Sequence, residues 1–211
     1  IGVDNTPTSF ELWVGGKMID RQDAFYIDAL WSKFLATTSS KSTRPSVMNS
    51  AAGQAWFPLH FFHCDNSTTP LPLVALQYQE VEIRVIQSSS ANNNYDIKMY
   101  GEYIQLDTTE RQWFTEQAHD MLITQVQRIQ ADATGSDLIY LNHPVKALMW
   151  GSNDNDNMVI DDVQLYVNGT QYYNSSMPTN YFNQITTYYH SENDTNNLSS
   201  DNYLYMFPFG M

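Results

Sequence analysis

The sequence predicts an all-β fold in which two related β-sandwich units are joined by a short helix. Segments rich in aromatic and β-branched residues dominate the chain, and clusters of Gly, Pro, Asn and Ser separate them. One such unit recurs about 150 residues later, a spacing that suits one sandwich domain. A single segment, which begins at Asp107, has clear helical spacing.

The strand signal occurs in short segments with turn residues on either side. These segments are 11–16, 56–63, 72–86, 103–106, 144–150, 163–169 and 203–209. Val81, Ile83 and Val85 alternate with mostly polar neighbours, which predicts a strand with one buried face. Residues 71–76 lack this alternation, so we expect a strand covered on both faces there.

The internal repeat is carried by two strand-and-turn segments. Residues 12–16, Leu-Trp-Val-Gly-Gly, align with residues 165–169, Leu-Tyr-Val-Asn-Gly. Each copy predicts a strand, a tight turn that contains glycine, a returning polar segment and an aromatic-rich stretch. Two sandwich domains need roughly 300 residues or more. We therefore expect the chain to hold the later part of one sandwich and the earlier part of another.

The helix is predicted from its cap and its apolar spacing. Asp107 and Glu110 have the spacing of a capping box, in which each side chain bonds the backbone N–H of the other residue. Behind them, apolar residues recur at three- and four-residue steps, which predicts one buried stripe. The stripe comprises Trp113, Phe114, Ala118, Met121 and Leu122, with Arg111, Glu116 and Asp120 outside it.

Composition argues against several classes of function. The net charge is −13, which disfavours direct binding to nucleic acid. We find no apolar run of about 18 residues that would span a membrane. Cys64 is the single cysteine, so no intrachain disulfide is expected. The sequence contains no nucleotide-binding or other cofactor motif, and we predict no cofactor. The start at Ile1 without methionine and the apolar run 204–211 indicate a partial chain.

One cluster has residue types that bind metals. His60, His63, Cys64 and Asp65 lie close together in the sequence. In a strand the two histidines would point to opposite faces, because side chains alternate along a strand. A shared metal would require a helical turn or a bulge, so we predict no metal site here.

Paired carboxylates and glycosylation sequons are the other candidate sites. Asp161 with Asp162, and Glu80 with Glu82, could serve as glycosidase acid and base, but adjacent acidic residues more often form a solvated edge. We therefore predict no enzymatic activity and no catalytic residue. Sequons of the Asn-x-Ser/Thr type are candidate glycosylation sites, and they occur at Asn66, Asn168, Asn174, Asn193 and Asn197.

Several blocks, taken in order, resemble the major capsid proteins of nucleocytoplasmic large DNA viruses. The blocks are 11–21, 56–67 leading into 70–85, 103–127, 141–150 and 163–175. They include PLPLVALQYQEVEIRV at 70–85 and LNHPVKALMW at 141–150, and each is only moderately specific, whereas five in order at the expected spacing are a strong signal. Gln79 stands where the family commonly has His, and Ala147 where it has Glu. The family's closing block is absent, which fits truncation after Met211.

The resemblance implies a tandem, or double, jelly roll of which both halves are incomplete here. Residues 1–106 would be the later part of the first jelly roll, 107–130 the capped helix and inter-domain connection, and 131–211 the earlier part of the second. It also implies a structural, non-enzymatic role in an icosahedral virus shell. Three copies would form a pseudo-hexameric capsomer, because each copy contributes two similar domains.

The implied partners are further copies of the same chain, in a homotrimer and in neighbouring capsomers, together with minor capsid proteins. The resemblance implies no direct contact with nucleic acid and no transmembrane segment. The implied location is the virion shell, assembled in the host cytoplasm. Two alternatives stay open: a secreted β-sandwich carbohydrate-binding protein or glycosidase, and a minor capsid paralogue of the same fold.

Overall fold

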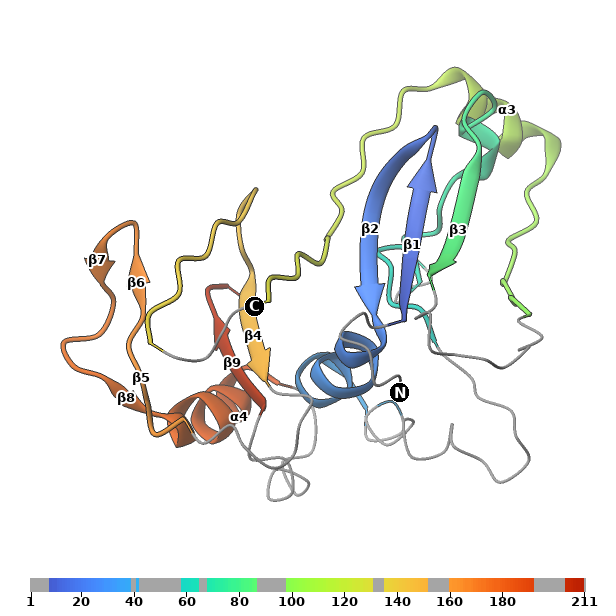
Figure 1. Ribbon diagram of the computed structural model, residues 1–211. Helices are drawn as coiled ribbons and strands as arrows, with labels where there is room; N and C mark the ends of the chain where they lie inside the picture. Colours follow the sequence, from blue (N-terminus) through green and yellow to red (C-terminus); the bar gives the residue numbers. More distant parts are fainter. Residues whose placement is uncertain are drawn as a thin grey trace, which may run out of the picture. The chain divides into compact units, whose positions relative to one another are not determined.

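A computed structural model describes residues 8–38, 41, 58–64, 68–86, 98–130, 135–151, 160–191 and 204–210. The chain divides into two compact units, each made of two separate stretches of sequence (Figure 1). Unit 1 comprises Ile1–Ala24 and Pro58–Gln127, and unit 2 comprises Phe25–Phe57 and Arg128–Met211. The described part of the chain is rich in sheet and has few helices, as the sequence predicts.

Unit 1 contains an antiparallel sheet in which β1 lies between β2 and β3 (Figure 1). The strands are β1 (Ser9–Val14), β2 (Lys17–Asp23) and β3 (Val81–Ile86). Gly15 and Gly16 connect β1 to β2 with φ angles of 58° and 75°, which are unfavourable for residues with a Cβ. Two central residues with positive φ form the turn that matches the twist of a hairpin. The predicted hairpin and the predicted strand at 81–86 are confirmed.

A buried polar network on β2 holds other parts of unit 1 to the sheet. The Gln22 side chain is almost fully buried, and its amide nitrogen donates to Asp20 Oδ2 at 2.9 Å and to the His60 carbonyl at 2.7 Å. The His60 N–H donates back to Gln22 Oε1 at 3.1 Å. Asp20 Oδ1 accepts from the Val126 N–H at 2.8 Å. Burial raises the pKa of the Asp20 carboxyl, and these hydrogen bonds oppose that shift.

Three predicted strands are wrong in the residues that the structure describes. Within 56–63, the part from residue 61 is a turn closed by the Cys64 N–H and the Phe61 carbonyl at 2.8 Å. Gln22 binds both backbone groups of His60, so they are unavailable to a neighbouring strand. Within residues 71–76, Leu73–Ala75 form a short 3₁₀ turn, η2, and Pro70 and Pro72 just before it lack an N–H for a ladder. Residues 103–106 are extended but unpaired with any described strand.

The predicted helix exists, but its apolar stripe is exposed. Helix α3 (Thr108–Glu116) begins with the predicted capping box, in which Glu110 N–H donates to Asp107 at 2.8 Å and Asp107 N–H to Glu110 at 3.0 Å. The helix ends at Glu116, because Gln117 has extended backbone angles. Trp113 is 55% exposed and Leu122, beyond the helix, is fully exposed. The prediction that this stripe is core is therefore wrong within the described chain.

Unit 2 is built on an antiparallel ribbon of two strands, β4 (Ala147–Gly151) and β9 (Leu204–Pro208). Both were predicted from sequence and are confirmed. One face of β9 presents Leu204 and Met206, which pack against Leu30 and Phe34. The other face presents Tyr205 and Phe207, which pack against Phe182. The ribbon is therefore covered on both sides.

The helices that cover the ribbon were not predicted. The elements are η1 (Tyr26–Leu35) and η3 (Tyr181–Ile185), both π-helical, and α4 (Thr186–His190), which continues η3. In η1 the Ala36 N–H donates to the carbonyl of Trp31, five residues earlier, at 3.0 Å. The sequence prediction treated these stretches only as aromatic-rich segments after each hairpin. Their aromatic residues favour strands by propensity, but packing against β9 overrides that preference.

The second copy of the repeat forms the same local structure as the first. Strands β6 (Tyr166–Val167) and β7 (Thr170–Gln171) form a hairpin, and β5 (Asp162–Val163) pairs with β8 (Met177–Pro178). Asn168 and Gly169 have φ angles of 51° and 77°, as the Gly15–Gly16 pair does. In both copies a helix with π-type hydrogen bonds follows.

Candidate functional site

The most exposed apolar surface of unit 1 lies on residues 98–127, which we call the exposed segment. Most of its residues are exposed. Its large exposed apolar side chains are Met99, Tyr100, Tyr103, Ile104, Trp113, Met121 and Leu122. Many exposed large apolar side chains along one segment suggest an interaction site.

The C-terminal end of the exposed segment is attached to the sheet of unit 1. Asp20 accepts from the Val126 N–H at 2.8 Å, and the Gln125 side-chain amide donates to the Ile19 carbonyl. Helix α3 also contacts η2. The backbone of the segment is thus fixed to unit 1, while its apolar side chains remain available to a partner.

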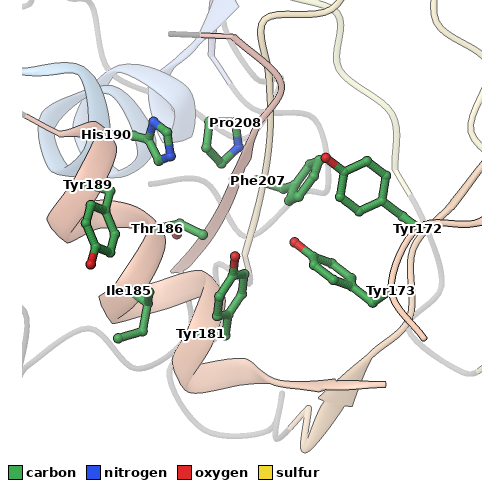
Figure 2. Close-up of a pocket in the computed structure, with 9 residues that line it drawn as sticks. All are labelled: Tyr172, Tyr173, Tyr181, Ile185, Thr186, Tyr189, His190, Phe207 and Pro208. Atoms are coloured by element: carbon green, nitrogen blue, oxygen red, sulfur yellow. The ribbon is translucent and has the colours of Figure 1, made fainter. Parts of the chain in front are cut away.

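Unit 2 contains an aromatic cavity of about 350 Å³ beside β9 and α4 (Figure 2). Phe207 and Thr186 are buried at its base, whereas Tyr172 and Tyr189 are 54% and 73% exposed at its rim. The complete lining is Tyr172, Tyr173, Tyr181, Ile185, Thr186, Tyr189, His190, Phe207 and Pro208. The lining comes from β9, from η3 and α4, and from the chain after β7, so folding brings together residues far apart in sequence.

The rings of this cavity pack edge to face. Tyr172 meets Phe207 at 5.1 Å and 81°, and Tyr173 meets Tyr181 at 5.8 Å and 79°. Burial raises the pKa of the Tyr173 phenol, and a hydrogen bond with Tyr181 raises it further. The phenol therefore stays protonated at neutral pH and can act as a hydrogen-bond donor.

His60, His63 and Cys64 are the members of the predicted cluster that lie in the described part of the chain. The His63 ring stacks on Phe61 at 6.1 Å and meets Phe62 edge to face at 5.0 Å. Cys64 is exposed, and Asp65 lies outside the described residues. Within the described ranges, no group of at least three His, Cys, Asp or Glu side chains could hold a metal ion.

Acid should destabilise the fold through His63. Burial lowers the pKa of its imidazole below 6.5, so the unfolded chain binds a proton before the folded one does. The free energy of unfolding is therefore unaffected by His63 well above pH 6.5, and it decreases as the pH falls through that value. Urea unfolding at pH 7.5 and 5.5 should show this loss, and His63→Phe should reduce it. The exposed His143, changed to Asn, should leave it unaltered; equal pH dependence in His63→Phe would contradict the assignment.

The predicted carboxylate pairs have ordinary structural partners. Glu82 forms an ion pair with Arg84 at 2.8 Å, and the Arg84 guanidinium lies 4.0 Å from the centre of the Trp13 ring. Asp162 accepts a hydrogen bond from Ser176 at 3.4 Å. These contacts hold the Glu82 and Asp162 side chains to neighbouring residues.

Two of the five sequons lie in the described residues. Asn168 occupies the β6–β7 turn, and Asn174 follows Tyr173 of the cavity; both asparagines are exposed. Asn66, Asn193 and Asn197 lie outside the described residues. Whether any sequon carries sugar stays a prediction.

None of the described helices is a candidate membrane span. Each helix in the described ranges is too short or too polar to cross a bilayer.

Known proteins similar to this chain are virus coat proteins. The family model described as "Major capsid protein N-terminus" matches residues 5–168. A major capsid protein of Pyramimonas orientalis virus is 30% identical over 213 residues, which cover 87% of this chain and 53% of that protein. The major capsid protein of Paramecium bursaria Chlorella virus 1 is 30% identical over 66% of this chain and 38% of its own length.

The fold is similar to that of a solved virus shell. A chain of the PBCV-1 virus capsid matches with a TM-score of 0.68 and 20% identity, over 96% of this chain and 64% of that one. This chain thus spans about half the length of the first curated relative and less than two thirds of the solved chain. The resemblance predicted from sequence is confirmed by the family match, and this chain belongs to the major capsid protein family of large DNA viruses.

Proposed function

We propose that the protein is a structural component of an icosahedral virus shell, in which three copies form a pseudo-hexameric capsomer. The observation that carries this proposal is the family match over residues 5–168. The whole protein would be a double jelly roll. Residues 1–106 would belong to the first jelly roll, 107–130 to the helix and connection between the two, and 131–211 to the second.

Two structural features support this assignment. The hairpin with positive φ and the π-helical segment after it occur twice, as expected for two related sandwiches. The exposed segment carries apolar side chains that this chain leaves in water. Stable interfaces between subunits commonly bury ~1,200–2,000 Å² or more, with an apolar centre. Covering this segment in a trimer would remove that exposure.

The same proposal includes partners and location. The protein would contact further copies of itself and minor capsid proteins, and it would reside in the virion shell after assembly in the host cytoplasm. With a net charge of −13, direct contact with the genome is disfavoured. The role would be structural and not enzymatic.

Leu122→Asp tests whether the exposed segment is an assembly surface. The side chain is fully exposed in one chain, so the change should have little effect on monomer stability. If a second copy covers it, a buried unpaired carboxylate should weaken the trimer at least tenfold, about 1.4 kcal/mol. Light scattering after size-exclusion chromatography of the full-length protein would measure this.

Tyr166→Ala provides the matched control, because Tyr166 is 61% exposed and lies outside the exposed segment. It should leave the trimer intact. A full-length protein that remains monomeric at high concentration would refute the shell role and favour the secreted sugar-binding alternative. Trimers that occupy only vertices or the inner side of the shell would favour a minor capsid paralogue.

A further inference from the structure

We propose that the aromatic cavity of unit 2 binds a neutral saccharide. This inference goes beyond the shell role, since assembly does not require a ligand site. It rests on the shape, the charge and the hydrogen-bonding groups of one set of side chains.

The size and surface of the cavity suit a small sugar. Its volume, about 350 Å³, lies at the lower end of the range for small-molecule sites, ~300–1,000 Å³. Phe207 forms a buried apolar base, and the exposed rings of Tyr172 and Tyr189 form the rim. Aromatic rings offer flat apolar faces against which the C–H groups of a sugar ring can pack.

The polar side chains that line the cavity are tyrosine and threonine hydroxyls and the His190 imidazole. Figure 2 shows the Tyr173 and Tyr181 hydroxyls turned toward one another, in agreement with the hydrogen bond between them. Their mutual bond uses one of the two hydroxyl protons, so the phenol that donates it can only accept from a ligand, whereas the other phenol can donate its own proton. Hydroxyl groups on a sugar can both donate and accept, so they can pair with these phenols without a proton transfer.

Charge favours a neutral ligand. The lining, all of it within the described residues, includes no Asp, Glu, Lys or Arg. An acidic sugar would find no fixed cation to pair with, and a buried unpaired charge is costly. Ring faces can also bind a cation, so the test includes a cationic probe.

The test is saturation-transfer NMR on full-length trimers made in bacteria, which add no N-linked sugar. The probes are methyl glucoside, methyl galactoside and methyl mannoside, each added alone. At least one neutral glycoside should receive saturation. Methyl glucuronide and choline, which are the anionic and cationic probes, should receive much less.

Variants assign the signal to this cavity. Tyr172→Ala and Tyr189→Ala each remove an exposed ring, so the fold should persist while glycoside binding weakens at least tenfold. Tyr173→Phe removes one hydroxyl and keeps the ring, and binding should weaken several-fold. Tyr166→Ala removes an exposed ring elsewhere and should bind as the unaltered protein does.

Several results would overturn the proposal. They are the absence of glycoside binding, binding that survives both alanine changes, and preferential binding of choline or of the glucuronide. Trimers that form normally but bind no glycoside would refute the sugar site while leaving the shell role in place. Monomers that bind glycosides would refute the shell role and keep the site.

Discussion

Changing Gln22 to Glu should destabilise the protein by about 3 kcal/mol, as expected for an uncompensated buried charge. The substitution preserves size and shape but replaces the amide nitrogen with a carboxylate oxygen. That nitrogen donates to Asp20 at 2.9 Å and to the His60 carbonyl at 2.7 Å. In the variant, the new carboxylate and that of Asp20 would lie next to each other in a buried position and repel. Urea unfolding of the full-length protein at pH 7.5 would measure the loss.

The effect of Gln22→Glu should depend on pH. Burial beside Asp20 should raise the pKa of the new carboxyl, so its neutral form dominates in acid and the deficit shrinks as the pH falls. Gln171→Glu is the matched control, because it adds the same charge at an exposed position on β7. Equal losses for the two variants would show that the polar network does not hold unit 1 together.

Phe182→Ala should cost about 3–5 kcal/mol, the range for removing a buried aromatic ring. Phe182 is fully buried on η3. Its ring centre lies 5.3 Å from those of Trp150 and Tyr181, and 6.4 Å from that of Phe207. The vacated volume would remove one packing partner from each of these three rings. Thermal unfolding would measure the loss, and Trp150 fluorescence should shift to longer wavelength as water enters.

Graded substitutions separate lost packing from other causes. Phe182→Leu fills part of the volume and should cost distinctly less than Phe182→Ala. Tyr166→Ala, at an exposed ring, should cost under about 0.5 kcal/mol. A Phe182→Ala protein as stable as the Tyr166→Ala protein would mean that the aromatic cluster contributes little to unit 2.

The features predictable from sequence were those set by local chemistry. The pair Gly15–Gly16 and the pair Asn168–Gly169 indicated tight hairpin turns, because such residues tolerate positive φ. The capping box at Asp107 depends on groups three residues apart. Strands β3, β4 and β9 were likewise identifiable by their composition.

The helices of unit 2 were missed although part of their signal is present. Ile27, Leu30, Trp31 and Phe34 have the three- and four-residue spacing of an amphipathic helix, and all four are buried. The sequence prediction treated this stretch only as an aromatic-rich segment after the hairpin. The choice is decided by packing on β9, which lies far along the chain, and no local pattern encodes that contact.

The apolar stripe and the aromatic cavity were beyond sequence reasoning for different reasons. Helical spacing identified Trp113 as apolar surface on one side, but spacing does not say whether the same chain covers it. The cavity combines Tyr172, Tyr189 and Phe207, which come from separate elements. Its existence depends on how α4 and β9 pack, so it becomes visible only in three dimensions.

Because the ribbon of β4 and β9 is covered on both faces, unit 2 cannot complete its fold until β9 has been synthesised. Helix η1 leaves the ribosome early, but Leu204 and Met206, which bury Leu30 and Phe34, are made much later. Translation at ~5–20 residues per second leaves η1 without its partner for many seconds. During that interval its apolar face is open to holding chaperones or to wrong contacts with neighbouring nascent chains. Unit 2 should therefore fold after translation has passed β9, and slow codons before Leu204 would lengthen the vulnerable period.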